Sequence, residues 1–221
     1  MSEPRARLLT SGSILLFVLL VLSGWHPYDR PTWWMEVAPV LIACPILFVT
    51  RRRFPLTTLL YVLFFLHACV LIVGGTYTYA RVPIGFAVAD WLGLERNPYD
   101  KLGHFFQGFV PAIAAREILI RGRFVHGDRM RRFLVLCVVL AISASYELVE
   151  WGAALAMGQG ADAFLGTQGD PWDTQSDMFL ALIGALVALA SLAPFHDRQL
   201  DRLAPANPGA RRPASTTNRF D

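Results

Sequence analysis

Six stretches of this sequence are long and apolar enough, or nearly so, to cross a lipid bilayer as helices. A membrane-spanning helix needs roughly 20 mainly apolar residues, within a range of about 17–25. The pattern predicts an all-α fold, a polytopic transmembrane helical bundle of about six helices. The six stretches cover, approximately, residues 8–24, 34–49, 56–75, 102–120, 133–157 and 177–193.

The composition agrees with a membrane protein. Hydrophobic residues make up 54% of the chain and charged residues only 17%, whereas soluble domains carry roughly 25% charged residues. This balance excludes disorder of the whole chain and argues against an ordinary soluble domain. The three cysteines form no CxxC pair, and the sequence has no nucleotide-binding loop, no serine-hydrolase motif and no HExxH zinc motif. Nothing in it predicts nucleic-acid binding.

Basic residues are dense in every second connection between the stretches. Sixteen of the 20 Lys and Arg residues lie before the first stretch, after the second, after the fourth and in the C-terminal tail. The positive-inside rule places these connections, and therefore both termini, in the cytoplasm. Because an odd number of spans would break this alternation, the charges support six helices with an N-in, C-in topology.

The chain is predicted to divide into a six-helix transmembrane domain, residues 1–194, and a disordered cytoplasmic tail, residues 195–221. The tail is rich in Pro, Ala, Arg and Ser/Thr, a composition typical of disorder. The longest outer connection, residues 76–100, contains an apolar run, VPIGFAVADWLGL, that is too short to span. We expect this run to lie in the membrane interface or to re-enter the membrane partway.

Acidic residues follow the opposite distribution, and two pairs of polar residues lie on helix faces near the outer side. Asp100 and His104, at the outer start of the fourth stretch, are four residues apart and share one face. Glu147 and Glu150 share one face of the fifth helix, roughly 21 and 25 Å from its start at about 1.5 Å per residue. That depth lies in the outer leaflet of a hydrocarbon core about 30 Å thick. Intramembrane acids usually face a bundle interior or a water-filled cavity and mark function.

A third acidic group, Asp170, Asp173 and Asp177, leads into the sixth stretch. Each group also has a structural explanation. Acids at a helix start stabilise the helix dipole, which accounts for Asp170 and Asp173 better than for Asp177. By the same reasoning Asp100 is a helix-start acid, and Glu147 and Glu150 are interfacial carboxylates if their helix ends early.

If helices four, five and six are neighbours, the three groups converge on one pocket that is open to the outside. So many carboxylates at close range must share protons, pair with Arg81, Arg96 or Lys101, or bind a cation. Carboxylate oxygens with one imidazole suit Mg²⁺, Ca²⁺, Mn²⁺ or Zn²⁺. The sequence therefore predicts a divalent cation as the possible cofactor. The candidate catalytic residues are Asp100, His104, Glu147 and Glu150, and the candidate metal ligands are Asp170, Asp173 and Asp177.

Three further residues have expected structural roles. His67, in the middle of the third stretch, is expected to hydrogen-bond to a neighbouring helix. Tyr79 is expected in the aromatic belt at the membrane interface. Gly184, in the sixth stretch, is expected to allow two helices to pack closely.

The motifs YDKLGHFFQGF, YELVEW and GTQGDPWDTQSDM resemble the YjdF-like family of uncharacterised bacterial inner-membrane proteins, over roughly Trp34 to Ala193. This resemblance implies a multi-pass protein of the bacterial inner membrane, with the lipid bilayer as its surroundings. A more distant resemblance is to VanZ-like membrane proteins, some of which are associated with glycopeptide resistance, and it implies a shared outward-facing polar site. The positions that match the VanZ-like pattern are Asp100, Lys101, His104, Phe105, Glu147 or Glu150, Asp170 and Asp173, with Asp177 where that pattern has Asn and Glu150 where Gln is common.

Three functions fit an integral membrane protein with such a site. The first is a metal-assisted enzyme that acts on a lipid-linked or envelope substrate. The second is a cation- or proton-coupled transporter or an ion-binding protein, although the polar groups gather at one end of the helices. The third is a non-catalytic envelope factor that senses or stabilises a partner. The sequence leaves the substrate, the metal, the oligomeric state and the pathway open.

Overall fold

A computed structural model describes residues 3–157 and 168–203 of the 221-residue chain. Over these residues the protein is helical and contains no strand, which confirms the predicted all-α fold. Five helices, α1, α2, α3, α6 and α8, are long and apolar enough to cross a membrane. The helices are α1 (Glu3–Trp25), α2 (Arg30–Thr50), α3 (Thr58–Tyr77), α4 (Pro83–Leu92), α5 (Tyr99–Arg121), α6 (Asp128–Met157) and α8 (Asp173–Leu203).

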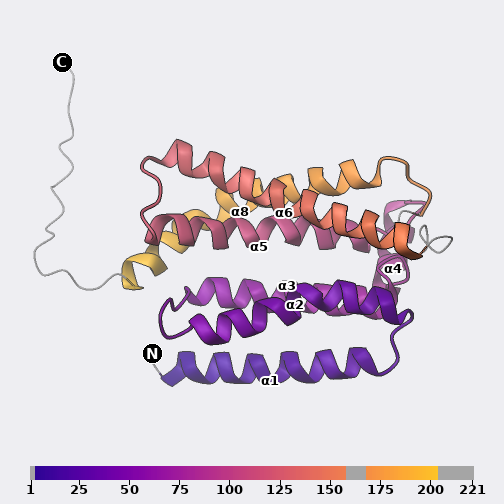
Figure 1. Cartoon of the computed structure of the whole chain (residues 1–221), viewed down its shortest axis with the longest axis horizontal. Helices are drawn as coiled ribbons and strands as arrows, with labels where there is room; N and C mark the ends of the chain where they lie inside the picture. Colours follow the sequence, from indigo (N-terminus) through magenta and orange to yellow (C-terminus); the bar gives the residue numbers. More distant parts are fainter. Residues whose placement is uncertain (1–2, 158–167, 204–221) are drawn as a thin grey trace, which may run out of the picture.

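Helix α5 is as long as the spanning helices but more polar. Its 23 residues extend about 34 Å at 1.5 Å per residue, enough to cross the hydrocarbon core. It packs against α3, α6 and α8, so neighbouring helices shield its polar side chains from lipid. With α5 as the sixth long helix, the start of α1 and the end of α8 lie at the same end of the bundle (Figure 1). The arginine distribution assigns that end to the cytoplasm.

The six long helices form two layers, one of α1, α2 and α3 and one of α5, α6 and α8 (Figure 1). Helix α3 joins the layers, because it packs on α1 and α2 and also on α5. The main apolar core lies among α3, α5, α6 and α8, where Leu60, Val110, Ile113 and Val139 are fully buried. A smaller cluster around Trp33 holds α1, α2 and α3 together.

The closest contact in the bundle is between α5 and α8. A methyl group on Gly108 would overlap the main-chain carbonyl of Ala181, and one on Gly184 would overlap the carbonyl of Phe105. Small residues let helix backbones approach in this way, and van der Waals packing of this kind drives helix association in lipid. The structural role expected for Gly184 is therefore confirmed. This contact fixes how the outer ends of α5 and α8 face each other.

Helix α8 continues beyond the end that the sequence predicts. Residues 195–203, which the sequence places in the disordered tail, are the last helical turns. Three residues of this part are held against the bundle. His196 is fully buried and Leu200 is buried, and the main-chain N–H of Leu59 donates to Gln199 Oε1 at 2.9 Å. The rest of the predicted tail, residues 204–221, lies outside the described residues.

The predicted short apolar segment in the outer connection forms helix α4. Its 10 residues extend about 15 Å, half the thickness of the hydrocarbon core. It lies at the end of the bundle opposite the start of α1 and the end of α8 (Figure 1). Asn97 holds the following loop in place, since its side chain donates to Val82 O at 2.9 Å. Gln168 bonds to the main chain of Asn97 through both its amide oxygen and its amide nitrogen, at 3.1 Å each. The loops before α5 and α8 are thereby tied together.

Two sequence expectations about single residues differ from the structure. The Nε2 atom of His67 is buried and has no hydrogen-bond partner among the described residues, so the expected interhelical bond through this atom is absent there. Tyr79 is not in the aromatic belt but is buried, with only 6% of its surface exposed. Its ring fits against Gly74 and Gly103, where the lack of a side chain leaves room for it. The left-handed conformations of Thr78 and Tyr79, with φ of 53° and 50°, turn the chain back toward the bundle.

Candidate functional site

The outer end of α5 contributes Asp100 and His104 to the site. As the four-residue spacing predicts, they lie on one face, and Nε2 of His104 is 3.5 Å from Oδ1 of Asp100. The other ring nitrogen, Nδ1, is 3.2 Å from Oε1 of Gln107. His104 is buried, with 6% of its surface exposed. The imidazole is therefore fixed at both nitrogens inside the bundle.

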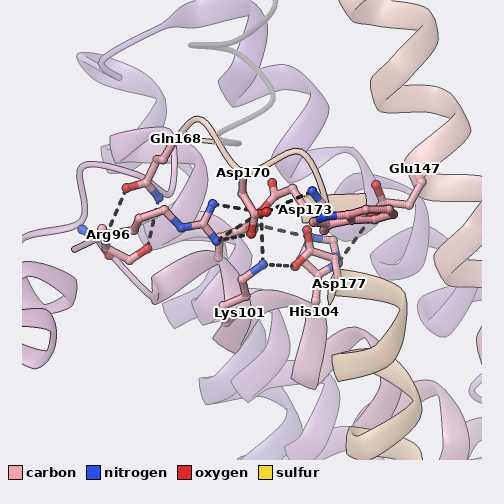
Figure 2. Close-up of polar contacts among 11 residues, drawn as sticks. Arg96, Lys101, His104, Glu147, Gln168, Asp170, Asp173 and Asp177 are labelled. Atoms are coloured by element: carbon pink, nitrogen blue, oxygen red, sulfur yellow. Dashed lines mark hydrogen bonds and ion pairs between the residues drawn. The ribbon is translucent and has the colours of Figure 1, made fainter. Parts of the chain in front are cut away.

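The start of α8 contributes aspartates that pair with two cations. Lys101 Nζ is 3.1 Å from Oδ1 of Asp173 and 2.9 Å from Oδ1 of Asp177. In Arg96, Nη2 is 3.1 Å from Oδ2 of Asp170 and Nη1 is 3.4 Å from Oδ1 of Asp173. Figure 2 shows these side chains meeting from the loop before α5, from α5 and from the start of α8. The predicted pairing of the acids with nearby cations is thus present for Arg96 and Lys101.

The remaining predicted cation has a different contact. The guanidinium of Arg81 lies 4.3 Å from the ring centre of Tyr28, a cation–π contact. Arg81 thus joins the turn after α3 to the loop between α1 and α2.

Helix α6 brings Glu147 and Glu150 to the same end. Oε1 of Glu147 is 3.9 Å from Nδ1 of His104 and, though buried, has no hydrogen-bond partner among the described residues. Glu150 interacts electrostatically with His104 and Asp100. The structure therefore brings the three predicted groups from α5, α6 and the start of α8 together at the outer end of the bundle.

Three of these side chains place their donor atoms closest together, and we call them the acid–His cluster: Asp100, His104 and Asp177. One donor atom from each lies within 4.8 Å of the others. Nε2 of His104 is 3.8 Å from Oδ2 of Asp177, in addition to its 3.5 Å contact with Asp100. Two ligands of a tetrahedral Zn²⁺, each about 2.1 Å from the ion, are about 3.4 Å apart. The two His104 distances are close to that value, although the set as a whole extends to 4.8 Å. The same arrangement equally suits an imidazolium between two carboxylates when no cation is bound.

The structure divides the residues that the sequence proposed as metal ligands. Asp177 faces His104 with one oxygen and Lys101 with the other. Asp170 and Asp173 instead face Arg96 and Lys101. The geometry thus groups Asp177 with Asp100 and His104 rather than with the other two aspartates.

Helix α2 of the N-terminal layer also reaches the site, which the sequence pattern did not lead us to predict. Glu36 of α2 is 93% buried, and its Oε2 accepts a hydrogen bond of 3.0 Å from the hydroxyl of Tyr146 on α6. Tyr79 also interacts electrostatically with Glu36. Burial raises the pKa of Tyr79 well above its ordinary value, so this hydroxyl stays protonated and can donate. The signal was available, because Glu36 is the one acid within its apolar stretch.

A separate polar cluster lies at the cytoplasmic end of the bundle and was also missed. Glu117 of α5 is fully buried and accepts hydrogen bonds from Thr57, Arg121 and His196, at 2.8 to 3.2 Å. Arg116 donates to Nδ1 of His196 at 3.0 Å, so the imidazole must donate to Glu117 through Nε2. Glu117 is the one acid among the arginines at this end of α5, and that isolation is the sequence signal. We call these five residues the inner polar cluster.

Comparison with known proteins identifies the family. A family of predicted membrane proteins, DUF2238, matches residues 8–198. The chain belongs to this family. Inner membrane protein YjdF from Escherichia coli (strain K12) is 64% identical over 195 residues, which are 88% of this chain and 93% of YjdF. No solved structure matches the chain.

Membership of the DUF2238 family confirms the YjdF-like resemblance noted in the motifs. The matched residues run from α1 into the last turns of α8, so they include the acid–His cluster, Glu36 and the inner polar cluster. This DUF2238 protein is an integral, multi-pass protein of the inner membrane.

Proposed function

We propose that this protein is a metal-assisted enzyme that acts at the outer face of the inner membrane on a lipid-linked envelope substrate. The observation that carries the proposal is the acid–His cluster, in which Asp100, His104 and Asp177 hold donor atoms within 4.8 Å of one another. The distant resemblance to VanZ-like proteins, at Asp100, His104 and Asp173, also favours an outward-facing polar site.

The donor set fits a divalent cation. Two carboxylates and one imidazole are ligands that Zn²⁺ and Mn²⁺ accept. A cation bound there would polarise a phosphoryl or carbonyl oxygen of the substrate. Asp100, His104 and Asp177 would be its ligands.

Glu147 has the properties of a general base beside this centre. Its buried Oε1 has no hydrogen-bond partner among the described residues, so it can accept a proton from water or from a substrate hydroxyl. Its 3.9 Å separation from Nδ1 of His104 places it next to the cluster. Lys101 and Arg96 hold Asp173 in place on the opposite side.

The arrangement favours an enzyme over a transporter along α5. Between Gln107, next to the acid–His cluster, and Arg116 of the inner polar cluster, this helix carries only the apolar sequence GFVPAIAA. Proton relays in membranes use chains of ionisable residues, and this part of α5 has none. The acid–His cluster is therefore better suited to chemistry at one face of the membrane than to transfer of ions or protons across the bilayer.

The proposal is tested by cation binding and by turnover. Purified full-length protein in lipid nanodiscs is expected to bind about one Mn²⁺, measured by electron paramagnetic resonance, because the cluster has one set of converging donors. Asp177→Asn and His104→Ala should each weaken binding at least tenfold. Asp170→Asn is the matched control, since Asp170 pairs with Arg96 outside the cluster, and it should bind Mn²⁺ like the wild type.

Turnover is measured by mass spectrometry of a bacterial envelope lipid extract incubated with the protein. A chelator should abolish any conversion, and one divalent ion should restore it. Glu147→Gln should keep Mn²⁺ binding but lose conversion. Equal Mn²⁺ binding by wild type and Asp177→Asn, or conversion that persists in chelator, would rule the proposal out.

A further inference from the structure

A large apolar cavity lies in the membrane part of the protein, extends among helices of both layers and is open on one side, where its lining residues Phe17 and Phe48 are 66% and 64% exposed. Its volume is about 1150 Å³, above the roughly 300–1,000 Å³ of most small-molecule pockets. Helices α1, α2, α3, α5 and α6 line it, mainly with Leu, Phe, Val and Ala side chains. Along α2 the lining runs from Glu36 to Arg51, about 22 Å at 1.5 Å per residue. The cavity is thus longer than one leaflet of a hydrocarbon core about 30 Å thick.

The outer end of this cavity is polar. Glu36, Asp100, His104, Tyr146 and Glu150 line it there. Glu36 and Glu150 interact electrostatically with each other and with the same imidazole. Three carboxylates thus share one imidazole at this end, while the side chains of Lys101 and Arg96 are paired with Asp173 and its neighbours on α8. No Lys or Arg is among the described residues that line this end, so a positively charged group is its complement.

We infer that the cavity binds the hydrocarbon chain of a membrane lipid whose headgroup carries a cationic amine, with the amine between Glu36 and Glu150. The cavity's length and apolar walls suit a long chain, and its acidic end suits an ammonium group. Asp100 and His104 belong to both the cavity wall and the acid–His cluster, so a lipid held here presents its headgroup to that cluster. The inference rests on the proposed function in that it names the substrate class.

The arrangement of the two layers leaves a lateral route by which a lipid can reach the cavity. Helix α3 packs against both layers, and on the side of α2 and α6 a hydrogen bond between Glu36 and Tyr146 connects them at the outer end. On the cytoplasmic side of this bond the cavity wall contains Cys44 of α2 and Ile142 of α6. A chain can therefore enter sideways from the bilayer while its headgroup stays at the outer end. His67, whose Nε2 has no partner among the described residues, lies on the cavity wall.

The chain-binding part is tested by filling the cavity. Gly12 and Ala43 line it, and a Cβ on Gly12 meets its nearest neighbour, Phe65, at an ordinary 3.9 Å. The double variant Gly12→Phe with Ala43→Phe should reduce bound phosphatidylethanolamine at least tenfold in native mass spectrometry of the full chain. The matched control is Ile14→Phe with Val49→Phe, which adds the same rings at positions that face away from the cavity and are 60% and 74% exposed.

The headgroup part is tested with lipids that differ in charge. Wild-type protein should retain phosphatidylethanolamine at least tenfold better than phosphatidylglycerol with the same acyl chains, because only the former carries an amine. Glu36→Gln with Glu150→Gln should remove that preference while lipid still binds. Glu95→Gln, an exposed acid outside the site, should keep it. The measured preference between the two lipids tests the inference even if the cavity-filling variant fails to fold.

Several results would overturn the inference. Equal retention of the two lipids by the wild type would remove the role of the carboxylates. Unchanged lipid binding by the cavity-filling variant would place the lipid elsewhere, and a second copy of the chain in place of lipid would make the cavity an interface. Mn²⁺ binding is measured on the same samples. Loss of lipid binding with one Mn²⁺ still bound would overturn the lipid site alone and leave the metal centre standing. Loss of Mn²⁺ binding with lipid still bound would overturn the metal centre alone.

Discussion

Gly108→Ala is expected to destabilise the protein by about 3 kcal/mol or more, since overpacking a well-packed contact costs 1–3 kcal/mol and main-chain atoms form the obstacle here. The added methyl group would overlap the carbonyl of Ala181 on α8. A flexible side chain could rotate away, but a helix backbone cannot. Helices α5 and α8 would have to separate, which opens the core around Val110 and Ile113.

The measurement is thermal unfolding of detergent-purified protein, followed by tryptophan fluorescence. A loss of about 3 kcal/mol corresponds to a fall in Tm of roughly 6–12 °C for a chain of this size. Gly152→Ala is the matched control, because it lies in α6 with no atom within 4 Å of the added methyl group. That variant should unfold at the same temperature or higher, since alanine is the better helix former. Unfolding of Gly108→Ala at the wild-type temperature would contradict the close α5–α8 contact.

Glu117→Gln is expected to cost about 3–5 kcal/mol, the range for removing one partner of a buried charge pair. The carboxylate accepts from the main chain and hydroxyl of Thr57, from Arg121 and from His196. A glutamine amide turns one of its two acceptor oxygens into a donor. A donor then faces a donor, and the guanidinium of Arg121 loses its counter-charge.

Two measurements check this result. The Tm should fall by an amount similar to that of Gly108→Ala, and hydrogen exchange should become faster in residues 195–203, because His196 ties that part of α8 to Glu117. Glu3→Gln is the control, since the Glu3–Arg7 pair is largely exposed and exposed pairs contribute little. Unchanged exchange in residues 195–203 together with an unchanged Tm would show that the inner polar cluster does not hold α8.

The two polar clusters contribute differently to the protein. In the inner polar cluster every named acceptor is matched with a donor, which is the pattern of a structural clamp among α3, α5 and α8. At the outer end, Glu147 beside the acid–His cluster keeps a buried oxygen without a partner among the described residues. The acid–His cluster also adjoins the apolar cavity, because Asp100 and His104 line it. This difference is why the proposed chemistry lies at the outer end.

Much of the candidate site could be predicted from the sequence, because depth in a membrane is encoded along the chain. Position along a helix of known rise gives the height of a residue in the bilayer, and arginines give the orientation. Those two quantities place Asp100, Glu147 and Asp177 at one level. The same reasoning applied to Glu36 would have added it, since it is an acid at the outer end of its own stretch.

Lateral arrangement could not be predicted in the same way. Which helix neighbours which, and how each is rotated, depends on packing between segments that are distant in the chain. That packing produces the contact of Gly108 with Ala181, the position of Lys101 between Asp173 and Asp177, and the apolar cavity. The helical end of α8 is another, because Glu117 and Leu59 hold residues whose composition alone is typical of a tail.

By itself, then, the sequence determined an all-helical membrane protein of six long segments with its carboxylates at one level near the outer face. Hydropathy and charge act along the membrane normal, so a one-dimensional pattern is enough to read them. Only the tertiary structure decided that Asp100, His104 and Asp177 meet, that Asp170 and Asp173 pair with cations instead, and that Glu36 closes the polar end of a cavity. Those outcomes depend on side-chain contacts in the membrane plane, which small residues at the α5–α8 interface set by allowing the helices to approach.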